Sequence, residues 1–142
     1  MRILAIDYGD ARIGLALSDE SETLASPLST YASQSMRKDI DYIAALAKEK
    51  GAGRIVLGLP VNMDGTEGAR AQKTRSFGSV LERVSGIEVV YKDERLTTVS
   101  AERTLIACNM RREKRKQVID TVSAQIILQS YLDAANRAKR QI

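Results

Sequence analysis

Residues 2–18, RILAIDYGDARIGLALS, hold two short apolar runs separated by a tight turn. The first run begins at Arg2 and ends at Asp7, just before a Tyr-Gly pair, and the second extends from Arg12 to Ser18. Apolar runs separated by a few glycine and polar residues are typical of a β-hairpin. We therefore expect two antiparallel strands at the start of the chain, with Asp7 at the end of the first.

The spacing of apolar residues along the rest of the chain predicts three more strands and four helices. They are expected at 27–31 (strand), 36–47 (helix, stopped by Gly51 and Gly53), 54–59 (strand), 67–84 (helix), 87–91 (strand), 97–110 (helix) and 116–138 (helix). Strands one, four and five would be parallel, because helices connect them. This order predicts a single α/β domain over residues 1–142, with a mixed five-stranded sheet and helices on both faces.

The composition excludes several kinds of chemistry. The 142 residues include no histidine, no tryptophan and one cysteine. Catalysis by a Ser-His-Asp or Cys-His pair is therefore excluded, as are a disulfide within the chain and a cysteine-rich zinc site. A metal site would need oxygen ligands, which favours hard divalent ions. Cys108, in a predicted helix, is expected to pack inertly.

Positive charge is concentrated near the C-terminus. Residues 100–142 hold 9 Lys/Arg against 4 Asp/Glu, whereas residues 1–99 are nearly balanced. The excess lies mainly in one run, formed by Arg111, Arg112, Lys114, Arg115 and Lys116. Such a run attracts a polyanion, because each neutralised phosphate releases a counterion. No apolar run reaches the ~20 residues of a membrane span, so we expect a cytoplasmic protein that contacts nucleic acid and no membrane.

Three acidic positions stand out against their surroundings. Asp7 follows an apolar strand, Asp93 and Glu94 follow the fifth strand, and Asp120 begins a largely apolar stripe of the last helix. Each has an ordinary alternative, respectively a turn cap, a pair with Arg95, and a helical pair with Lys116. Strand alternation indicates that only one of Asp93 and Glu94 faces the site, without indicating which.

Together, these acids predict a shared cation. Parallel strands present their carboxyl ends at one edge of a sheet, where ligands usually bind. Carboxylates gathered there stay ionised together only beside a cation, and a divalent ion can activate water for attack on a phosphodiester. The loop 59–68 follows the fourth strand at that edge, and Asn62 in it is a candidate to hydrogen-bond a phosphate.

Four segments carrying these residues resemble the YqgF family. They are DYGDARIGLALSD (7–19), LPVNMDGTEG (59–68), DERLTT (93–98) and KQVID (116–120) with ILQSYLD (127–133). Members of that family are RNase H-like bacterial proteins, described as candidate Holliday junction resolvases and candidate nucleases for the 5′ end of pre-16S rRNA. The likeness covers nearly the whole chain.

The resemblance implies an RNase H-like fold with Asp7, Glu94 and Asp120 as catalytic and metal-binding residues. It also implies that Arg12 and Arg95 lie near the substrate. Related RuvC-type resolvases carry a further acid where this chain has Ser123, which leaves the number of bound ions open.

The leading hypothesis is an endonuclease that depends on Mg²⁺ or Mn²⁺ and hydrolyses phosphodiester bonds in 5′-end processing of pre-16S rRNA during ribosome biogenesis. Arg12 and Lys116 would position the phosphate. The alternatives are a Holliday junction resolvase acting on branched DNA, a catalytically silent nucleic-acid-binding module, and an actin-like nucleotide phosphotransferase. Either a monomer or a homodimer fits the sequence.

Overall fold

A computed structural model describes residues 1–109 and 112–140, without the side chains of residues 100, 107, 109 and 112–117. The elements in chain order are β1 (Arg2–Tyr8), β2 (Arg12–Ser18), β3 (Ala25–Ala32), α1 (Met36–Glu49), β4 (Ala52–Leu59), α2 (Ala69–Ser85), β5 (Glu88–Asp93), the 3₁₀ turn η1 (Glu94–Leu96), α3 (Val99–Asn109) and α4 (Arg112–Arg140).

The five strands form one mixed sheet in the order β3-β2-β1-β4-β5. β1 pairs antiparallel with β2, and β2 with β3. β1, β4 and β5 run parallel to one another, which confirms the predicted parallel set. The carboxyl ends of these three strands therefore lie at the same edge of the sheet.

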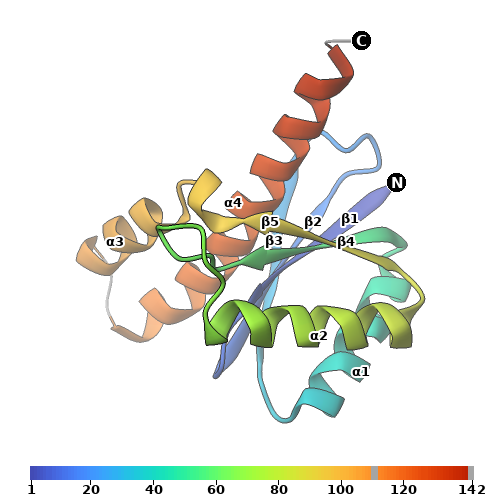
Figure 1. The fold of residues 1–142 in the computed structure, drawn as a ribbon, viewed down its shortest axis with the longest axis horizontal. Coiled ribbons are helices and arrows are strands. Elements are labelled where there is room, and N and C mark those ends of the chain that lie inside the picture. The colour runs from blue at the N-terminus through green and yellow to red at the C-terminus, as the bar shows by residue number, and fades with distance from the viewer. Residues whose placement is uncertain (110–111, 141–142) are drawn as a thin grey trace.

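Helices cover both faces of the sheet, as predicted (Figure 1). On one face, α1 and α2 pack on a core that includes Ile40, Ile43 and Phe77. On the other, α4 crosses the sheet and buries Ala124 and Ile127 against small and branched strand residues. α3 packs mainly on α4, and its first residue, Val99, is buried in the same core.

Two details differ from the prediction. Gly51 follows the C-cap Lys50 of α1 with φ 69°, as expected of a helix stop, but Gly53 lies inside β4, because the strand begins at Ala52. Cys108 is exposed on α3 and does not pack in a core, since α3 lies outside the two main layers.

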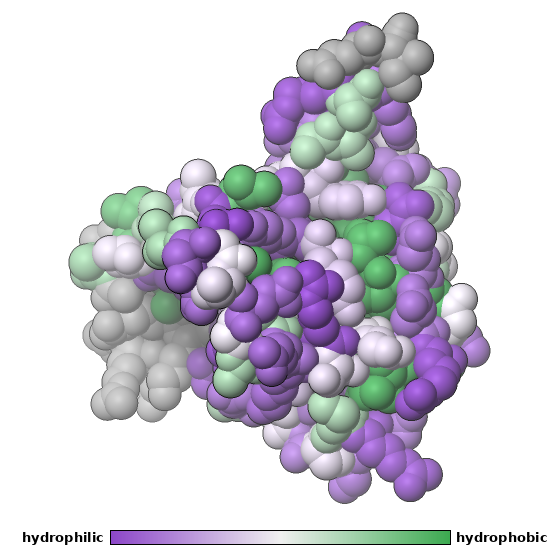
Figure 2. Space-filling model, in the orientation of Figure 1, coloured by the Kyte–Doolittle hydropathy of each residue, from purple (hydrophilic) through white to green (hydrophobic). Residues whose placement is uncertain are grey.

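The face in Figure 2 is largely hydrophilic, with hydrophobic side chains visible in scattered patches. Among the described residues, no helix has both the length and the apolar character needed to cross a bilayer.

Candidate active site

Three acidic side chains from distant parts of the chain come together at the carboxyl end of the parallel strands. Asp7 is the penultimate residue of β1, Glu94 follows β5 directly, and Asp120 lies in α4. Their side chains are only 12%, 17% and 16% exposed, respectively. Three largely buried carboxylates in one region need compensating positive charge.

Two glycines make this approach possible. Gly14 of β2 lies opposite Asp7 in the hairpin, and a Cβ added to it would be 2.0 Å from the backbone oxygen of Asp120. A Cβ added to Gly58 of β4 would be 2.9 Å from Oε1 of Glu94. The missing side chains therefore let α4 and the Glu94 carboxylate approach the end of β1 closely.

Arg103 of α3 supplies the positive charge between two of the acids. Its Nη2 donates to both carboxylate oxygens of Asp7, at 3.2 and 3.1 Å. Its Nη1 lies 3.9 Å from Oε2 of Glu94, and its Nε donates to Oγ of Ser123 at 3.0 Å. One guanidinium thus joins Asp7, Glu94 and Ser123.

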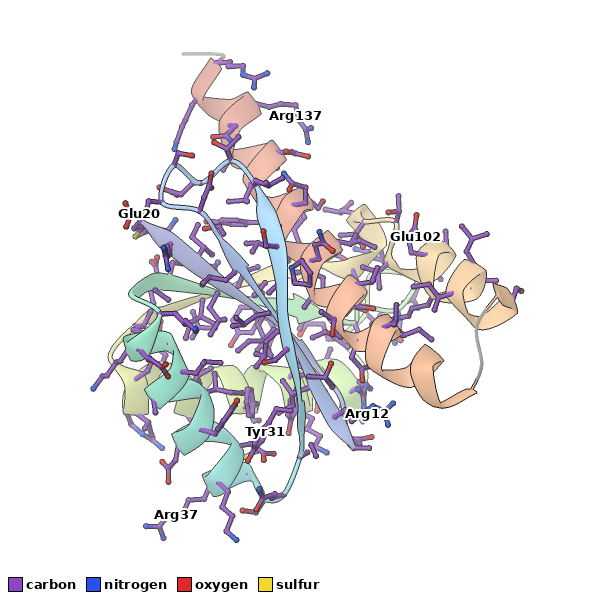
Figure 3. All side chains as sticks on the ribbon, turned by 180° about the vertical axis from the view of Figure 1, so that it is seen from behind. Arg12, Glu20, Tyr31, Arg37, Glu102 and Arg137 are labelled. Atoms are coloured by element: carbon purple, nitrogen blue, oxygen red, sulfur yellow. The ribbon has the colours of Figure 1, made fainter. Side chains whose placement is uncertain are left out.

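Asp120 has a different partner. Nε of Arg12 donates to Oδ2 of Asp120 at 2.7 Å, which ties the start of β2 to α4. Figure 3 shows Arg12 at the end of the hairpin, beside α4. Helical spacing suggested Lys116 as an ordinary partner of Asp120, but its side chain lies outside the described residues, so that alternative stays a prediction.

Burial shifts the titration of the two acids nearest Arg103. Desolvation raises the pKa of Asp7 above 3.8, although the Arg103 guanidinium acts in the opposite direction. Desolvation also raises the pKa of Glu94 above 4.5, and the nearby Asp7 charge adds to the effect. Asp120 likewise raises the pKa of Asp7. The carboxylates are therefore close enough to interact electrostatically, which is common in catalytic sites.

The alternation of side chains left open whether Asp93 or Glu94 faces this cluster. The carboxylate of Glu94 lies beside Arg103 and Asp7. Asp93 instead accepts from the backbone N–H of Arg95 at 2.9 Å and pairs with its guanidinium at 2.7 Å. β5 ends at Asp93 and η1 begins at Glu94, which directs the Glu94 side chain toward the site. The Asp93 side chain instead caps η1.

The other residues proposed to bind nucleic acid lie around the cluster or outside the described part. Arg95 is bound to Asp93, as described above. The Asn62 side-chain amide donates to the Thr66 hydroxyl at 3.0 Å, so its contacts lie within its own loop. Arg111 and the side chains of Arg112, Lys114, Arg115 and Lys116 are not described.

Two arginines near the acids were not predicted from the sequence. Arg103 lies 96 residues from Asp7, in a helix with no distinctive pattern around it. Arg70 of α2 donates to the backbone oxygen of Tyr8 and to Asp10, both at 2.9 Å, and its charge lowers the pKa of Asp7 and Glu94. Tertiary packing of α2 and α3 places both arginines, so local spacing held no signal for them.

The donor set fits a hard divalent cation. Carboxylate oxygens are the ligands that Mg²⁺ and Mn²⁺ prefer. Within the described part of the chain, no three acidic ligands are already gathered around one point. Arginine nitrogens lie 2.7–3.9 Å from all three carboxylates instead, so this edge of the sheet already accommodates positive charge.

Comparison with known sequences gives consistent matches over nearly the whole chain. The family model described as "RuvX: Holliday junction resolvase" matches residues 1–134. A protein of Heliobacterium modesticaldum is 47% identical over 94% of this chain and 90% of its own length. One from Agathobacter rectalis is 42% identical, over 98% and 99% respectively. Both are named as candidate pre-16S rRNA nucleases.

Solved structures share the fold at low sequence identity. Thermus thermophilus RuvC in complex with a Holliday junction substrate matches with a TM-score of 0.60 and 11% identity, over 95% of this chain and 96% of that one. The fowlpox virus resolvase, in complex with Holliday junction DNA, matches with a TM-score of 0.55 and 11% identity, over 95% and 99%. These likenesses confirm the predicted RNase H-like fold.

Proposed function

The chain belongs to the RuvX/YqgF family, and from this premise we propose that it is a metal-dependent nuclease that hydrolyses phosphodiester bonds in structured nucleic acid. We propose pre-16S rRNA as the substrate, as the names of the relatives suggest. Processing of ribosomal RNA would place the protein in the bacterial cytoplasm. The observation that carries the proposal is the convergence of Asp7, Glu94 and Asp120 around arginine nitrogens.

The proposed cofactor is Mg²⁺ or Mn²⁺, held by the carboxylates of Asp7, Glu94 and Asp120. A bound divalent ion would lower the pKa of a water and stabilise charge on the phosphate. The three carboxylates are mostly shielded from solvent, which strengthens their attraction for a cation.

The arginines and the basic run would orient the substrate. Arg12 is one-third exposed and lies at the rim beside Asp120, where its guanidinium can meet a phosphate. The basic run, residues 111–116, directly precedes and begins α4, the helix that carries Asp120. Lysines and arginines there would hold the nucleic-acid backbone, which fixes register without reading sequence.

The decisive experiment compares the wild type with Asp7→Asn in Mn²⁺-dependent cleavage of a pre-16S rRNA fragment. Glu88→Gln is a matched control, because Glu88 is an exposed acid paired with Arg54 away from the cluster. We expect cleavage by the wild type and Glu88→Gln, and its loss in Asp7→Asn. Equal cleavage by Asp7→Asn would remove the site assignment, and binding without cleavage in Mg²⁺ and Mn²⁺ would favour a silent binding module.

A second candidate substrate is a four-way DNA junction, which the description of the matching family favours. The same carboxylates would act on either phosphodiester. A junction is symmetric, so a resolvase would act as a homodimer, whereas RNA processing needs only a monomer. Junction cleavage without rRNA cleavage, together with a dimer in sedimentation experiments, would favour this alternative.

A further inference from the structure

Arg103 lies against Asp7, Glu94 and Ser123 through different nitrogens of one guanidinium. Nη2 hydrogen-bonds Asp7, Nε hydrogen-bonds Ser123, and Nη1 lies 3.9 Å from Glu94. A guanidinium is planar and permanently charged, so two hydrogen bonds on different sides fix its orientation. The three acidic and polar side chains thus form a site for one positive charge, with the Arg103 side chain about one-third exposed.

Ser123 contributes to this site without adding charge. It is buried, at 1% exposure, and its Oγ accepts the hydrogen bond from Nε of Arg103. An acid at position 123 would add a fourth carboxylate to the cluster. The hydroxyl of Ser123 instead gives Nε of Arg103 an uncharged hydrogen-bond acceptor.

The balance of charge limits how many divalent ions fit. Asp7, Glu94 and Asp120 can carry three negative charges, and the contacts of the described residues set Arg103 and Arg12 against them. The charge of Arg70 also acts on Asp7 and Glu94. The arginines therefore offset much of the negative charge, so a second divalent ion beside the first would add strong repulsion at short range.

We infer that Arg103 takes the place of a second divalent cation, so that the site works with one metal ion and one guanidinium. This inference rests on the proposed nuclease function. A second metal ion would stabilise negative charge on the phosphate. Here Arg103 would do so instead, because its planar guanidinium can donate two parallel hydrogen bonds to phosphate oxygens.

Equilibrium binding of Mn²⁺ without nucleic acid tests the inference directly. Calorimetry and electron paramagnetic resonance would count bound ions in the wild type, Arg103→Lys, Arg103→Gln and the double variant Arg103→Gln with Ser123→Asp. Arg54→Gln is the control, since Arg54 pairs with Glu88 at the opposite end of β5 from Glu94. Circular dichroism would check that each variant folds.

We expect one Mn²⁺ in the wild type, Arg103→Lys and Arg54→Gln. Removal of the positive charge in Arg103→Gln should tighten binding by about tenfold or more, since the guanidinium and the bound ion would no longer repel each other at short range. The double variant should bind two ions. Two ions in the wild type, or one ion with unchanged affinity in the folded double variant, would overturn the inference alone. Absence of Mn²⁺ binding from every variant would overturn the proposed function as well.

Discussion

Replacement of Gly14 by alanine should separate α4 from the sheet and disable the site. The added Cβ would lie 2.0 Å from the backbone oxygen of Asp120, 2.5 Å from its carbonyl carbon and 3.1 Å from its Cα. These are backbone atoms, so no side-chain rotation relieves the clash. Ordinary contact begins at 3.4 Å, so the helix must retreat by about 1.4 Å.

Two effects of this substitution oppose each other in stability. Alanine in a strand gains ~0.5–1 kcal/mol over glycine, because the unfolded chain has less freedom to lose. Overpacking of a tight interface costs ~1–3 kcal/mol, and here it meets rigid backbone, so the cost should dominate. The retreat of Asp120 by about 1.4 Å should also slow cleavage by ~100-fold or more, since a 1 Å misplacement can have that effect.

Urea denaturation and cleavage kinetics would measure both effects. Gly53→Ala is the matched control, because it also lies in a strand and its Cβ would meet only the flexible Met1 side chain, with Sδ at 2.5 Å. We expect the control to keep wild-type activity and to be at least as stable as the wild type, because alanine restricts the unfolded chain more than glycine. Equal stability and equal cleavage rates for Gly14→Ala and Gly53→Ala would refute the close approach of α4 as a requirement of the site.

Three further predictions concern titration, packing and charge. Without metal, the folded chain binds the carboxyl proton of Asp7 more tightly than the unfolded chain does, because the pKa of Asp7 is raised above 3.8 on folding. The free energy of unfolding of the wild type, relative to that of Asp7→Asn, should therefore fall as the pH rises from 3.8 through the raised pKa. Urea titrations across this pH range in a chelator would measure the difference, and a constant difference would contradict the assigned burial. Gly58→Ala should weaken Mn²⁺ binding several-fold and cost ~1–3 kcal/mol in stability, because its Cβ would lie 2.9 Å from Oε1 of Glu94 and 2.5 Å from Cδ1 of the buried Ile127. Unchanged affinity in calorimetry would refute this prediction. Alanine replacements of the basic residues within 111–116 should flatten the plot of log association constant for nucleic acid against log salt concentration. The slope should change by ~0.9 for each duplex phosphate that the variant no longer neutralises, and an unchanged slope would show that this run faces away from nucleic acid.

Local patterns were sufficient to predict the elements that carry the acids. The hairpin followed from the two apolar runs around Asp7, and the parallel set followed from the helices between its strands. From this order alone, Asp7 and the end of the fifth strand could be placed at one edge of the sheet. The family resemblance then separated Glu94 from Asp93, which alternation along a strand left open.

Tertiary packing determined what the sequence did not reveal. Arg103 meets Asp7 only because α3 packs on α4, and no periodicity in the chain encodes that contact. The Arg12–Asp120 pair spans 108 residues, and a helical partner four residues away was the simpler expectation. Glycines such as Gly14 look like ordinary turn or strand residues until the helix that crosses them is known.

The most direct test of the account is a crystal structure of the protein soaked in Mn²⁺, with ions located by anomalous scattering. The account predicts one Mn²⁺ peak coordinated by Asp7 and its acidic neighbours, with Arg103 still bonded to Ser123. A fully loaded crystal with no peak at these carboxylates, or with Mn²⁺ bound only elsewhere, would contradict it.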